Sequence, residues 1–521
     1  MTSLWPSPHH PTPVNGTVFV PGSKSLMARY MIIAAMGDKP SVIHAPLRAR
    51  DTYLMADALR ALGIGVEWRQ GSDESHDVLT ITPRVMRSAS IEAGLAGTVM
   101  RFVPPLAALI DGTVHIDGDE TARVRPMGPV VTALRELGVE VEAVTLADGT
   151  TVLPVTVYGV GRVEGGELNI DSSASSQFIS ALLLAAPRFE RGLHLRSVGE
   201  KIPSTPHLKM TVDVLRRAGI TVEEFSRDGK LITNTSKTSE GTQPLTGTDM
   251  SPLNDSKGTA TAKNVHGGTT VCVGKTQGEE HARCSQQDSR VPSAPNPTTE
   301  EPAVQWRVHH GVPHLGSVVV EPDLSNASPF LAAAMVTGGT VSIPNWPEHT
   351  TQPGAQAAPI FESMGATISF EKTGPGVGTL SLTGPEKIRP LDRDLGDVGE
   401  LTPTLAAVCA LAEGSSRLRN IGQLRGHETN RLAAITTELN KLGITAYEEG
   451  DDIIILDPSQ ALHAWNSTQS STQLASYEDH RMATFAAILG LRFENIVVEN
   501  IETTSKTMPR FADMWKELLG E

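Results

Sequence analysis

The stretch ADALRALGIGVEW, residues 56–68, joins two elements of secondary structure. Its first half has the apolar spacing of a helix that ends at Gly63, and its second half alternates as a half-buried strand does. Glycine suits a helix end because it adopts the left-handed conformation without a Cβ clash. The pattern returns around Gly138, Gly219, Gly365, Gly443 and Gly520. We therefore expect a chain built from a repeated helix–strand unit.

A second repeated pattern is a small or polar cluster that leads into a helix rich in alanine and leucine. It occurs in residues 22–35, 94–109, 173–186, 324–335, 399–412 and 477–489. The N-terminus of a helix presents free N–H groups and partial positive charge, so each cluster is expected to attract anions. If symmetry relates the units, the clusters would face one another across a cleft between two domains.

The spacing of the glycines predicts how the chain divides. They advance by 75, 81, 146, 78 and 77 residues. Residues 230–303 hold 74 residues without an aromatic side chain, a composition typical of disorder, and subtracting them from the third interval leaves 72. We predict six units, with a first domain at 21–229, a disordered polar insertion at 230–303 and a second domain at 304–521. Residues 1–20 are expected to join the second domain, where the VNGTVFV segment (14–20) would supply the strand that the last unit lacks.

The composition is that of an ordinary globular protein, with 39% hydrophobic and 20% charged residues among 521. A formal charge of −15 argues against a nucleic-acid partner, because phosphate backbones require a basic surface. Three cysteines are too few for a disulfide framework, which suits a reducing compartment. The N-terminal residues lack a secretory-signal pattern, and no apolar run approaches the ~18–20 residues that span a bilayer. We expect a cytoplasmic protein without a membrane partner.

Neither a metal ion nor a bound nucleotide is predicted. The segment VFVPGSKS (18–25) lacks the first glycine of a phosphate-binding loop, and GLAGT (94–98) lacks the glycine spacing of a dinucleotide fingerprint. Four side chains of the insertion lack standard zinc-finger spacing: His266, Cys272, His281 and Cys284.

Cationic residues recur beside the helix starts, which favours a binding site over solvated surface charge. They are Lys24, Arg29, Arg101, Arg125, Arg425, Arg431, Arg481 and Lys506. Arg binds phosphate and carboxylate groups through paired hydrogen bonds, and Lys adds a mobile charge. Four carboxylates nearby are candidates either for acid–base chemistry or for helix capping alone: Asp323, Glu400, Glu428 and Asp479.

Seven motifs, in order, resemble those of the EPSP (5-enolpyruvylshikimate-3-phosphate) synthase family. They are PGSKSLMAR (21–29), GLAGTVMR (94–101), RPM (125–127), SSQFISALLL (175–184), ETNRL (428–432), EDHRMA (478–483) and SKTMPRF (505–511). The resemblance implies an α/β fold of two domains, each an inside-out barrel, or prism, of three βαβαββ units. It also implies transfer of the enolpyruvyl group of phosphoenolpyruvate to the 5-hydroxyl of shikimate 3-phosphate, with release of phosphate by addition and elimination.

The resemblance places this transferase reaction in the shikimate pathway, which leads to chorismate and the aromatic amino acids, and implies a target of glyphosate. Both substrates are anionic small molecules, which would explain the many cations. The family requires no cofactor, so none is expected. We expect a monomer whose domains close on the first substrate.

Matching motifs imply roles for individual residues. Those implied to contact shikimate 3-phosphate are Lys24, Ser25, Arg29, Ser175, Ser176, Gln177, Ser204, Glu400, Gln423 and His427. Those implied to contact phosphoenolpyruvate are Lys24, Gly97, Arg125, Gln177, Arg431, Arg481 and Lys506. Catalysis is implied for Lys24, for Glu400 as the base that accepts the 5-hydroxyl proton, and for Glu428 as the acid that protonates the methylene carbon.

Several positions depart from the commoner family pattern, although most keep hydrogen-bonding capacity. Leu95 stands where Asn is frequent, His207 where Tyr is common, and Glu400 where Asp is common. His427 replaces Lys and Gln423 replaces Asn, so the shikimate contacts at these two positions are open.

Two other functions remain open from the sequence. A sister enolpyruvyl transferase acts on UDP-N-acetylglucosamine, but its family commonly uses a loop cysteine as general acid. Here Cys409 lies in an apolar helical segment, and the other two cysteines lie in the insertion. A non-catalytic anion-binding protein would keep the cations yet could lose Lys24, Glu400 or Glu428, and all three are present. An active enzyme is therefore favoured.

Overall fold

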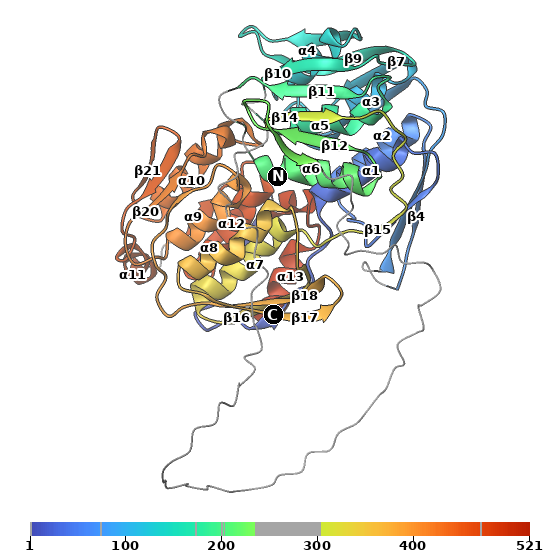
Figure 1. Cartoon of the computed structure of the whole chain (residues 1–521). Helices are drawn as coiled ribbons and strands as arrows, with labels where there is room; N and C mark the ends of the chain where they lie inside the picture. Colours follow the sequence, from blue (N-terminus) through green and yellow to red (C-terminus); the bar gives the residue numbers. More distant parts are fainter. Residues whose placement is uncertain are drawn as a thin grey trace, which may run out of the picture.

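The structure of the protein is a computed structural model, which describes residues 3–72, 76–171, 175–199, 202, 204–234, 304–468 and 471–521. The described chain forms two α/β domains, seen as two lobes in Figure 1. The four His and Cys side chains weighed as zinc ligands lie outside the described residues, as does most of the predicted insertion. Leu231–Asn234, which the sequence placed in that insertion, instead forms strand β13 of the first domain.

Three sheets build the first domain, with strand orders β15-β3-β5-β4, β6-β7-β9-β8 and β10-β11-β14-β12-β13. Their other strands are β3 (Ser41–His44), β4 (Gly65–Arg69), β5 (Val78–Thr82), β6 (Ala89–Glu92), β7 (Asp111–Asp117), β8 (Glu140–Thr145), β9 (Thr151–Val160), β10 (Gly166–Ile170), β11 (Leu193–Ser197), β12 (Val222–Phe225), β14 (Gln305–Val308) and β15 (Ser317–Val319).

Three sheets also build the second domain, with strand orders β17-β18-β16-β2, β19-β20-β22-β21 and β1-β24-β23. Their strands are β1 (Leu4–Pro6), β2 (Gly16–Thr17), β16 (Thr340–Pro347), β17 (Thr367–Gly374), β18 (Val377–Thr383), β19 (Asp392–Asp394), β20 (Ser416–Arg419), β21 (Ala446–Glu449), β22 (Asp452–Ile455), β23 (Thr472–Leu474) and β24 (Ile496–Glu499).

Every sheet repeats one pattern of pairing. Each holds one parallel pair, such as β6 with β7 or β19 with β20, and its remaining strands pair antiparallel. Parallel strands need a crossover, and a helix supplies it in four of the six sheets, whereas the β2–β16 and β15–β3 pairs join distant parts of the chain. The six glycines that mark the repeat all have positive φ, between 76° and 113°. The predicted βαβαββ units are therefore present, three around each domain.

Helices fill the interior of each domain, and sheets cover the outside. Six helices are buried almost all round: α1 (Lys24–Ala35), α3 (Gly97–Ala107), α5 (Gln177–Ala185), α7 (Leu324–Thr337), α9 (Thr402–Cys409) and α12 (His480–Gly490). Within each domain the three buried helices pack on one another. Among the described residues the sheets stay separate, so each domain is a three-sided prism without a closed barrel.

The other long helices each bury one face. They are α2 (Arg50–Ala61), α4 (Gly128–Glu136), α6 (Thr205–Arg217), α8 (Ala357–Ser363), α10 (Arg431–Lys441) and α13 (Phe511–Leu519). A further helix, α11 (Ala461–Thr468), is packed partly against the second core. Each domain has its own apolar core, one around Phe102 and Trp306 and the other around Phe330 and Trp515. No helix in the described part of the chain is long and apolar enough to cross a membrane.

The domains exchange strands, which agrees with the predicted assignment of residues 1–20 to the second domain but moves the predicted start of that domain after the insertion. Strand β2 precedes α1 along the chain but pairs with β16 of the second domain, and β15 precedes α7 but pairs with β3 of the first. Strand β14 also lies in a first-domain sheet, between β11 and β12. Residues 305–319 therefore belong with the first domain. The last unit is completed by β1 paired with β24, and not by the 14–20 segment.

The two crossings between the domains lie against each other. Gly22 and Pro322 form an antiparallel bridge, Ser23 N–H donates to the Glu321 carbonyl at 2.7 Å, and Asp323 N–H donates to the Pro21 carbonyl at 2.8 Å. A Cβ at Gly22 would stand 2.9 Å from the Ala45 carbonyl oxygen, so the close approach requires glycine. Helices α1 and α7 start directly beyond this junction.

Candidate active site

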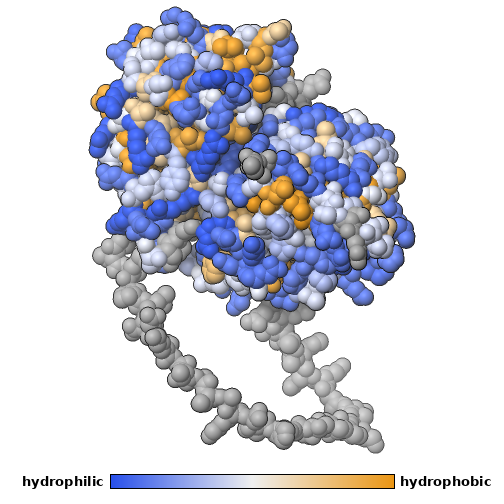
Figure 2. Space-filling view, turned by 180° about the vertical axis from the view of Figure 1, so that it is seen from behind, coloured by the Kyte–Doolittle hydropathy of each residue, from blue (hydrophilic) through white to orange (hydrophobic). Residues whose placement is uncertain are grey.

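The six buried helices begin at one cleft between the domains. Residues at or beside each start line it, from Lys24 of α1 and Gly97 of α3 to Arg481 of α12. Helix starts carry partial positive charge, so their convergence favours a bound anion. Figure 2 shows the two lobes from behind, with hydrophilic side chains along the visible junction.

Most of the residues predicted for the site line this cleft. They are Lys24, Ser25, Arg29, Gly97, Arg125, Ser175, Gln177, Glu400, His427, Glu428, Arg431, Arg481 and Lys506. The motifs lie up to 482 residues apart in the chain, from Lys24 to Lys506, and the prism brings them together because each stands at the same place in its own unit.

Three predicted residues lie outside the cleft lining: Ser176, Ser204 and Gln423. Ser176 is buried beneath the start of α5. Ser204 has a left-handed backbone, and its N–H donates to the Gly396 carbonyl at 3.3 Å. Gln423 Nε2 donates to that same carbonyl at 3.2 Å. Gly396 and Gln423 belong to the second domain, so the Ser204 bond joins the two domains beside the cleft, while the Gln423 bond lies within the second.

Cations outnumber carboxylates in the cleft. Seven Lys and Arg side chains line it, against Asp323, Glu400 and Glu428. The first-domain arginines are poorly compensated: burial lowers the pKa of Arg29 to about 9, and burial followed by repulsion from Arg125 lowers that of Arg101. A lowered pKa means that the free protein disfavours these charges, so an anion that neutralises them would be bound strongly.

Arg29 is held rigidly at the first-domain wall. Its Nε donates to Thr211 Oγ1 at 2.8 Å, its Nη1 to the Ser25 carbonyl at 2.8 Å, and its Nη2 to the His207 carbonyl at 3.0 Å. Phe102 packs beneath the guanidinium, with its ring centroid 5.5 Å from Cζ. The charge is thus positioned before any ligand arrives.

Arg101 and Arg125 keep unused hydrogen-bonding capacity. Arg101 Nη1 donates to Gln177 Oε1 at 2.6 Å, and Arg125 Nη1 donates to the Leu95 carbonyl at 3.2 Å. The buried Nε of each arginine has no partner among the described residues. A Cβ at Gly97 would stand 3.0 Å from Arg125 Nη2, so glycine leaves this guanidinium its room.

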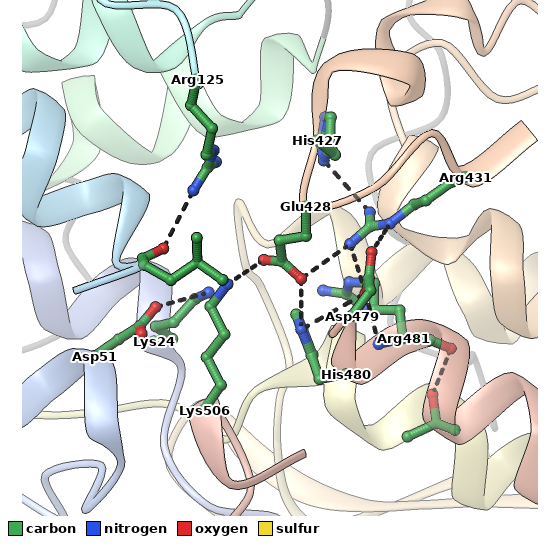
Figure 3. Close-up of polar contacts among 12 residues, drawn as sticks. Lys24, Asp51, Arg125, His427, Glu428, Arg431, Asp479, His480, Arg481 and Lys506 are labelled. Atoms are coloured by element: carbon green, nitrogen blue, oxygen red, sulfur yellow. Dashed lines mark hydrogen bonds and ion pairs between the residues drawn. The ribbon is translucent and has the colours of Figure 1, made fainter. Parts of the chain in front are cut away.

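Glu428 lies at the centre of a cationic cluster (Figure 3). Lys506 Nζ donates to its Oε1, while His480 Nδ1 lies 3.0 Å and Arg431 Nη2 3.7 Å from Oε2. Burial alone would raise the pKa of Glu428, but Lys506, His480 and Arg431 outweigh it and hold the pKa well below its usual range. Glu428 is therefore a carboxylate in the free protein.

Asp479 fixes the arginines beside Glu428. It is fully buried, and Arg431 donates to both of its oxygens, from Nε at 2.7 Å and from Nη2 at 3.1 Å. Its Oδ1 also accepts the Arg481 N–H at 2.9 Å, which caps α12. One carboxylate thus orients the Arg431 fork and starts the helix that carries His480 and Arg481.

Glu400 lies across the cleft on the 3₁₀ turn η4 (Gly399–Leu401). Ser325 Oγ donates to its Oε1 at 3.3 Å, and His207 Nε2 of the first domain lies 3.7 Å from the same oxygen. Burial raises the pKa of Glu400, although Arg481 opposes the shift. Burial and the cations around His207 lower its pKa to about 3, so this imidazole is neutral near pH 7. Glu400 has the environment of a base poised closer to neutrality than an exposed carboxylate.

Sequence reasoning missed several cleft residues. Ser325 lies in the 324–335 cluster but was given no role, and Gln352 lies in no motif. Asp51, which lies outside the cleft lining and outside every motif, pairs with Lys24 Nζ at 3.4 Å. His480 stands inside the EDHR motif, and its neighbours alone would have placed it in the site. Its bond to Glu428, 52 residues earlier, is visible only in the folded chain.

Glu428, Asp479 and His480 also bring one potential metal ligand each within 4.8 Å of one another. Both carboxylates are already paired with cationic side chains, Glu428 with Lys506 and Asp479 with Arg431. A divalent ion would have to displace these charges, so the group fits an anion site better.

The fold and the cleft are those of a two-domain α/β protein whose cationic cleft suits small anionic ligands and is also lined by Glu400 and Glu428. A family model described as EPSP synthase (3-phosphoshikimate 1-carboxyvinyltransferase) matches residues 8–255 and 298–515. The chain belongs to the EPSP synthase family.

Two relatives and a solved structure agree with this family assignment. The 3-phosphoshikimate 1-carboxyvinyltransferase of Kocuria rhizophila is 44% identical, over 99% of this chain and 97% of its own. The protein of the same name from Bifidobacterium longum is 40% identical, over 100% of this chain and 99% of its own. The fold is similar to that of EPSP synthase from Acinetobacter baumannii, with a TM-score of 0.68 at 19% identity over 99% of this chain and 98% of that one.

Proposed function

We propose that this protein transfers the enolpyruvyl group of phosphoenolpyruvate to the 5-hydroxyl of shikimate 3-phosphate and releases phosphate. The observation that carries the proposal is the cleft itself, where seven cations meet two carboxylates suited to proton transfer. The names of relatives at 40–44% identity support the choice of substrates. Action as a cytoplasmic monomer stays a prediction of the sequence, as does closure of the domains.

Binding would divide between the two walls. Shikimate 3-phosphate would lie against Lys24, Ser25 and Arg29, where the guanidinium of Arg29 bonds hydroxyl and carbonyl groups and no carboxylate among the described residues. Phosphoenolpyruvate would lie toward Arg431 and Lys506, with Arg125 opposite (Figure 3). Fixed cations reduce the reorganisation that charge development would otherwise require.

The addition step needs one base and one acid. Glu400 takes the proton of the 5-hydroxyl while the hydroxyl oxygen bonds to C2 of phosphoenolpyruvate. At the same time C3 of phosphoenolpyruvate receives a proton from Glu428. The product is a tetrahedral intermediate that still carries the phosphate. In the elimination step C3 returns a proton to the Glu428 carboxylate, the C2–C3 double bond re-forms, and the bond between C2 and the phosphate oxygen breaks, so that phosphate leaves. Each positioned proton transfer typically contributes ~10²–10⁴-fold.

The structure speaks against the cysteine chemistry of the rival transferase at the one cysteine it describes. Cys409 is fully buried inside α9, does not line the cleft, and burial raises the pKa of its thiol to about 12. A thiol in that setting is inert.

The test is phosphate release after the two substrates are mixed. Wild-type protein is expected to release phosphate only when both are present, and Glu428→Ala to be slower by ~10²–10⁴-fold. Arg425→Ala serves as the control, because Arg425 pairs with Glu448 outside the cleft. Equal rates for wild type and Glu428→Ala would refute the role of Glu428. No release from wild type would refute the function.

A further inference from the structure

Glu438 is a buried carboxylate that lies outside the cleft, on the same helix as Arg431. Glu438 lies two turns after Arg431 on α10, so both side chains project from the same face of the helix. The Glu438 side chain is wholly inaccessible to solvent and does not line the cleft. The proposed reaction gives it no role.

Both oxygens of Glu438 accept hydrogen bonds from the segment that leads into α12. The Tyr477 hydroxyl donates to Oε1 at 2.5 Å, and the Ala475 N–H donates to Oε2 at 3.2 Å. Lys441 Nζ donates to the two oxygens at 2.9 and 2.7 Å. Since each oxygen faces donors, a carboxylate fits here, whereas an amide would turn its own N–H groups toward another donor.

The segment held by Glu438 has an unfavourable backbone. Tyr477 and Glu478 have φ values of 55° and 56°, a region that residues other than glycine rarely enter. Such conformations persist where the surrounding contacts enforce them, and they gather at functional sites. The next residue, Asp479, pairs with Arg431. Helix α10 therefore holds both ends of the strained turn. Glu438 binds the start of the turn, at Ala475 and Tyr477, and Arg431 binds Asp479, which follows the turn.

We propose that Glu438 is a positioning residue for phosphoenolpyruvate binding. Through Tyr477 and Ala475 it holds Tyr477 and Glu478 in their left-handed conformation, and this sets where His480 and Arg481 stand relative to Arg431. The inference rests on the proposed function, because it takes phosphoenolpyruvate to be the anion at this wall. The first-domain residues that face shikimate 3-phosphate receive no support from the turn, so the two substrates should respond differently.

The test compares Tyr477→Phe with Tyr447→Phe in steady-state kinetics for both substrates. Tyr477→Phe removes only the hydroxyl that bonds Glu438, while Tyr447 is a half-exposed tyrosine on β21 that does not line the cleft. We expect Tyr477→Phe to raise KM for phosphoenolpyruvate by up to about tenfold, the factor that corresponds to the low end of what a hydrogen bond to a charged group contributes to stability. KM for shikimate 3-phosphate should stay within about twofold, and Tyr447→Phe should match wild type.

A second variant separates positioning from stability. Glu438→Gln should raise KM for phosphoenolpyruvate further than Tyr477→Phe does, because its amide meets a donor. An unchanged KM for phosphoenolpyruvate, or an equal rise in KM for both substrates, in variants that fold would overturn the proposal. Failure of the proposed function is recognised separately, since wild type would then release no phosphate at all.

Discussion

Glu428 is a carboxylate in the free protein, yet its proposed role requires it to deliver a proton. The contacts that hold its pKa low come from Lys506, His480 and Arg431. Phosphoenolpyruvate would bring its own negative charges to Lys506 and Arg431, which weakens their hold on Glu428. The substrate would thereby raise the pKa of the acid that acts on it.

Proton uptake on substrate binding follows from this reasoning. A carboxyl whose pKa rises on binding takes up a proton at any pH between its free and bound values. We expect phosphoenolpyruvate, titrated into a Glu400→Gln variant that already holds shikimate 3-phosphate, to show a buffer-dependent enthalpy that reports uptake. Adding Glu428→Gln should abolish the dependence. The same enthalpy in every buffer for the single variant would contradict this account.

Glu400 should govern the acid side of the pH profile. It must be ionised to accept the 5-hydroxyl proton, and burial raises its pKa. As pH falls through that raised value, Glu400 becomes protonated and kcat/KM should decline, at a higher pH than an exposed Glu would cause. His207 stays neutral above pH about 3, so His207→Gln should keep the same decline of kcat/KM at low pH. If His207→Gln lost this decline of kcat/KM, the decline would be due to the imidazole of His207 and not to Glu400.

The identities of many site residues could be predicted from the sequence, but their partners could not. Lys24, Arg125 and Arg481 belong to motifs readable along the chain. The pairing of Glu428 with His480 and of Lys24 with Asp51 depends on how distant units pack. Gln423 shows the limit of a motif, since its side chain reaches a backbone carbonyl beside the cleft and not the cleft itself.

At the scale of elements, the repeat was predictable because its signals are local. Apolar spacing and a terminal glycine, such as Gly63, mark each amphipathic helix within a dozen residues. Residues 1–20 were correctly assigned to the second domain, but the pairing of β2 with β16 and the transfer of β15 to the first domain escaped prediction, because both strands are short and pair with distant segments. Strand β2 has two residues and β15 three, too few to show alternation, and their partners lie about 325 and 275 residues away.

Asp323 links the two helices that start at the domain crossing. Its Oδ1 accepts the Asn326 N–H of its own helix α7 at 3.0 Å, and its Oδ2 accepts the Lys24 N–H of α1 at 3.1 Å. We expect Asp323→Ala to cost roughly 1 kcal/mol for the lost cap, and to raise KM for shikimate 3-phosphate because Lys24 loses its anchor.

Asn430→Ala is the matched control for this prediction. Asn430 also caps a helix, α10, through the Ala433 N–H at 3.3 Å, but it has no hydrogen bond to the other domain within the described part of the chain. Both variants should lower the melting temperature, and Asp323→Ala should lower it further. Equal losses in the two variants, with KM unchanged, would show that the bond to Lys24 contributes nothing.

On the scale of the whole molecule, the protein has a net negative charge but a cleft lined mainly by cations. The chain carries −15, yet the cleft has seven cations against three carboxylates. Screening confines surface fields to about 8 Å at physiological salt, so the acidic exterior has little influence on an anion already inside the cleft. Because the walls of the cleft exclude water, each cation there attracts an anion more strongly than the same cation would on the surface.

The exchange of strands makes the halves of the chain interdependent. A polypeptide cut between residues 235 and 303 would leave β1 and β2 on one fragment, although the second domain needs them. It would leave β14 on the other, although β14 lies in the middle of a first-domain sheet. We expect each fragment expressed alone to be unfolded, and the co-expressed pair to purify together and regain phosphate release. Cooperative unfolding of either fragment alone would count against this. On this expectation, complementation through the exchanged strands would replace the covalent link between the fragments.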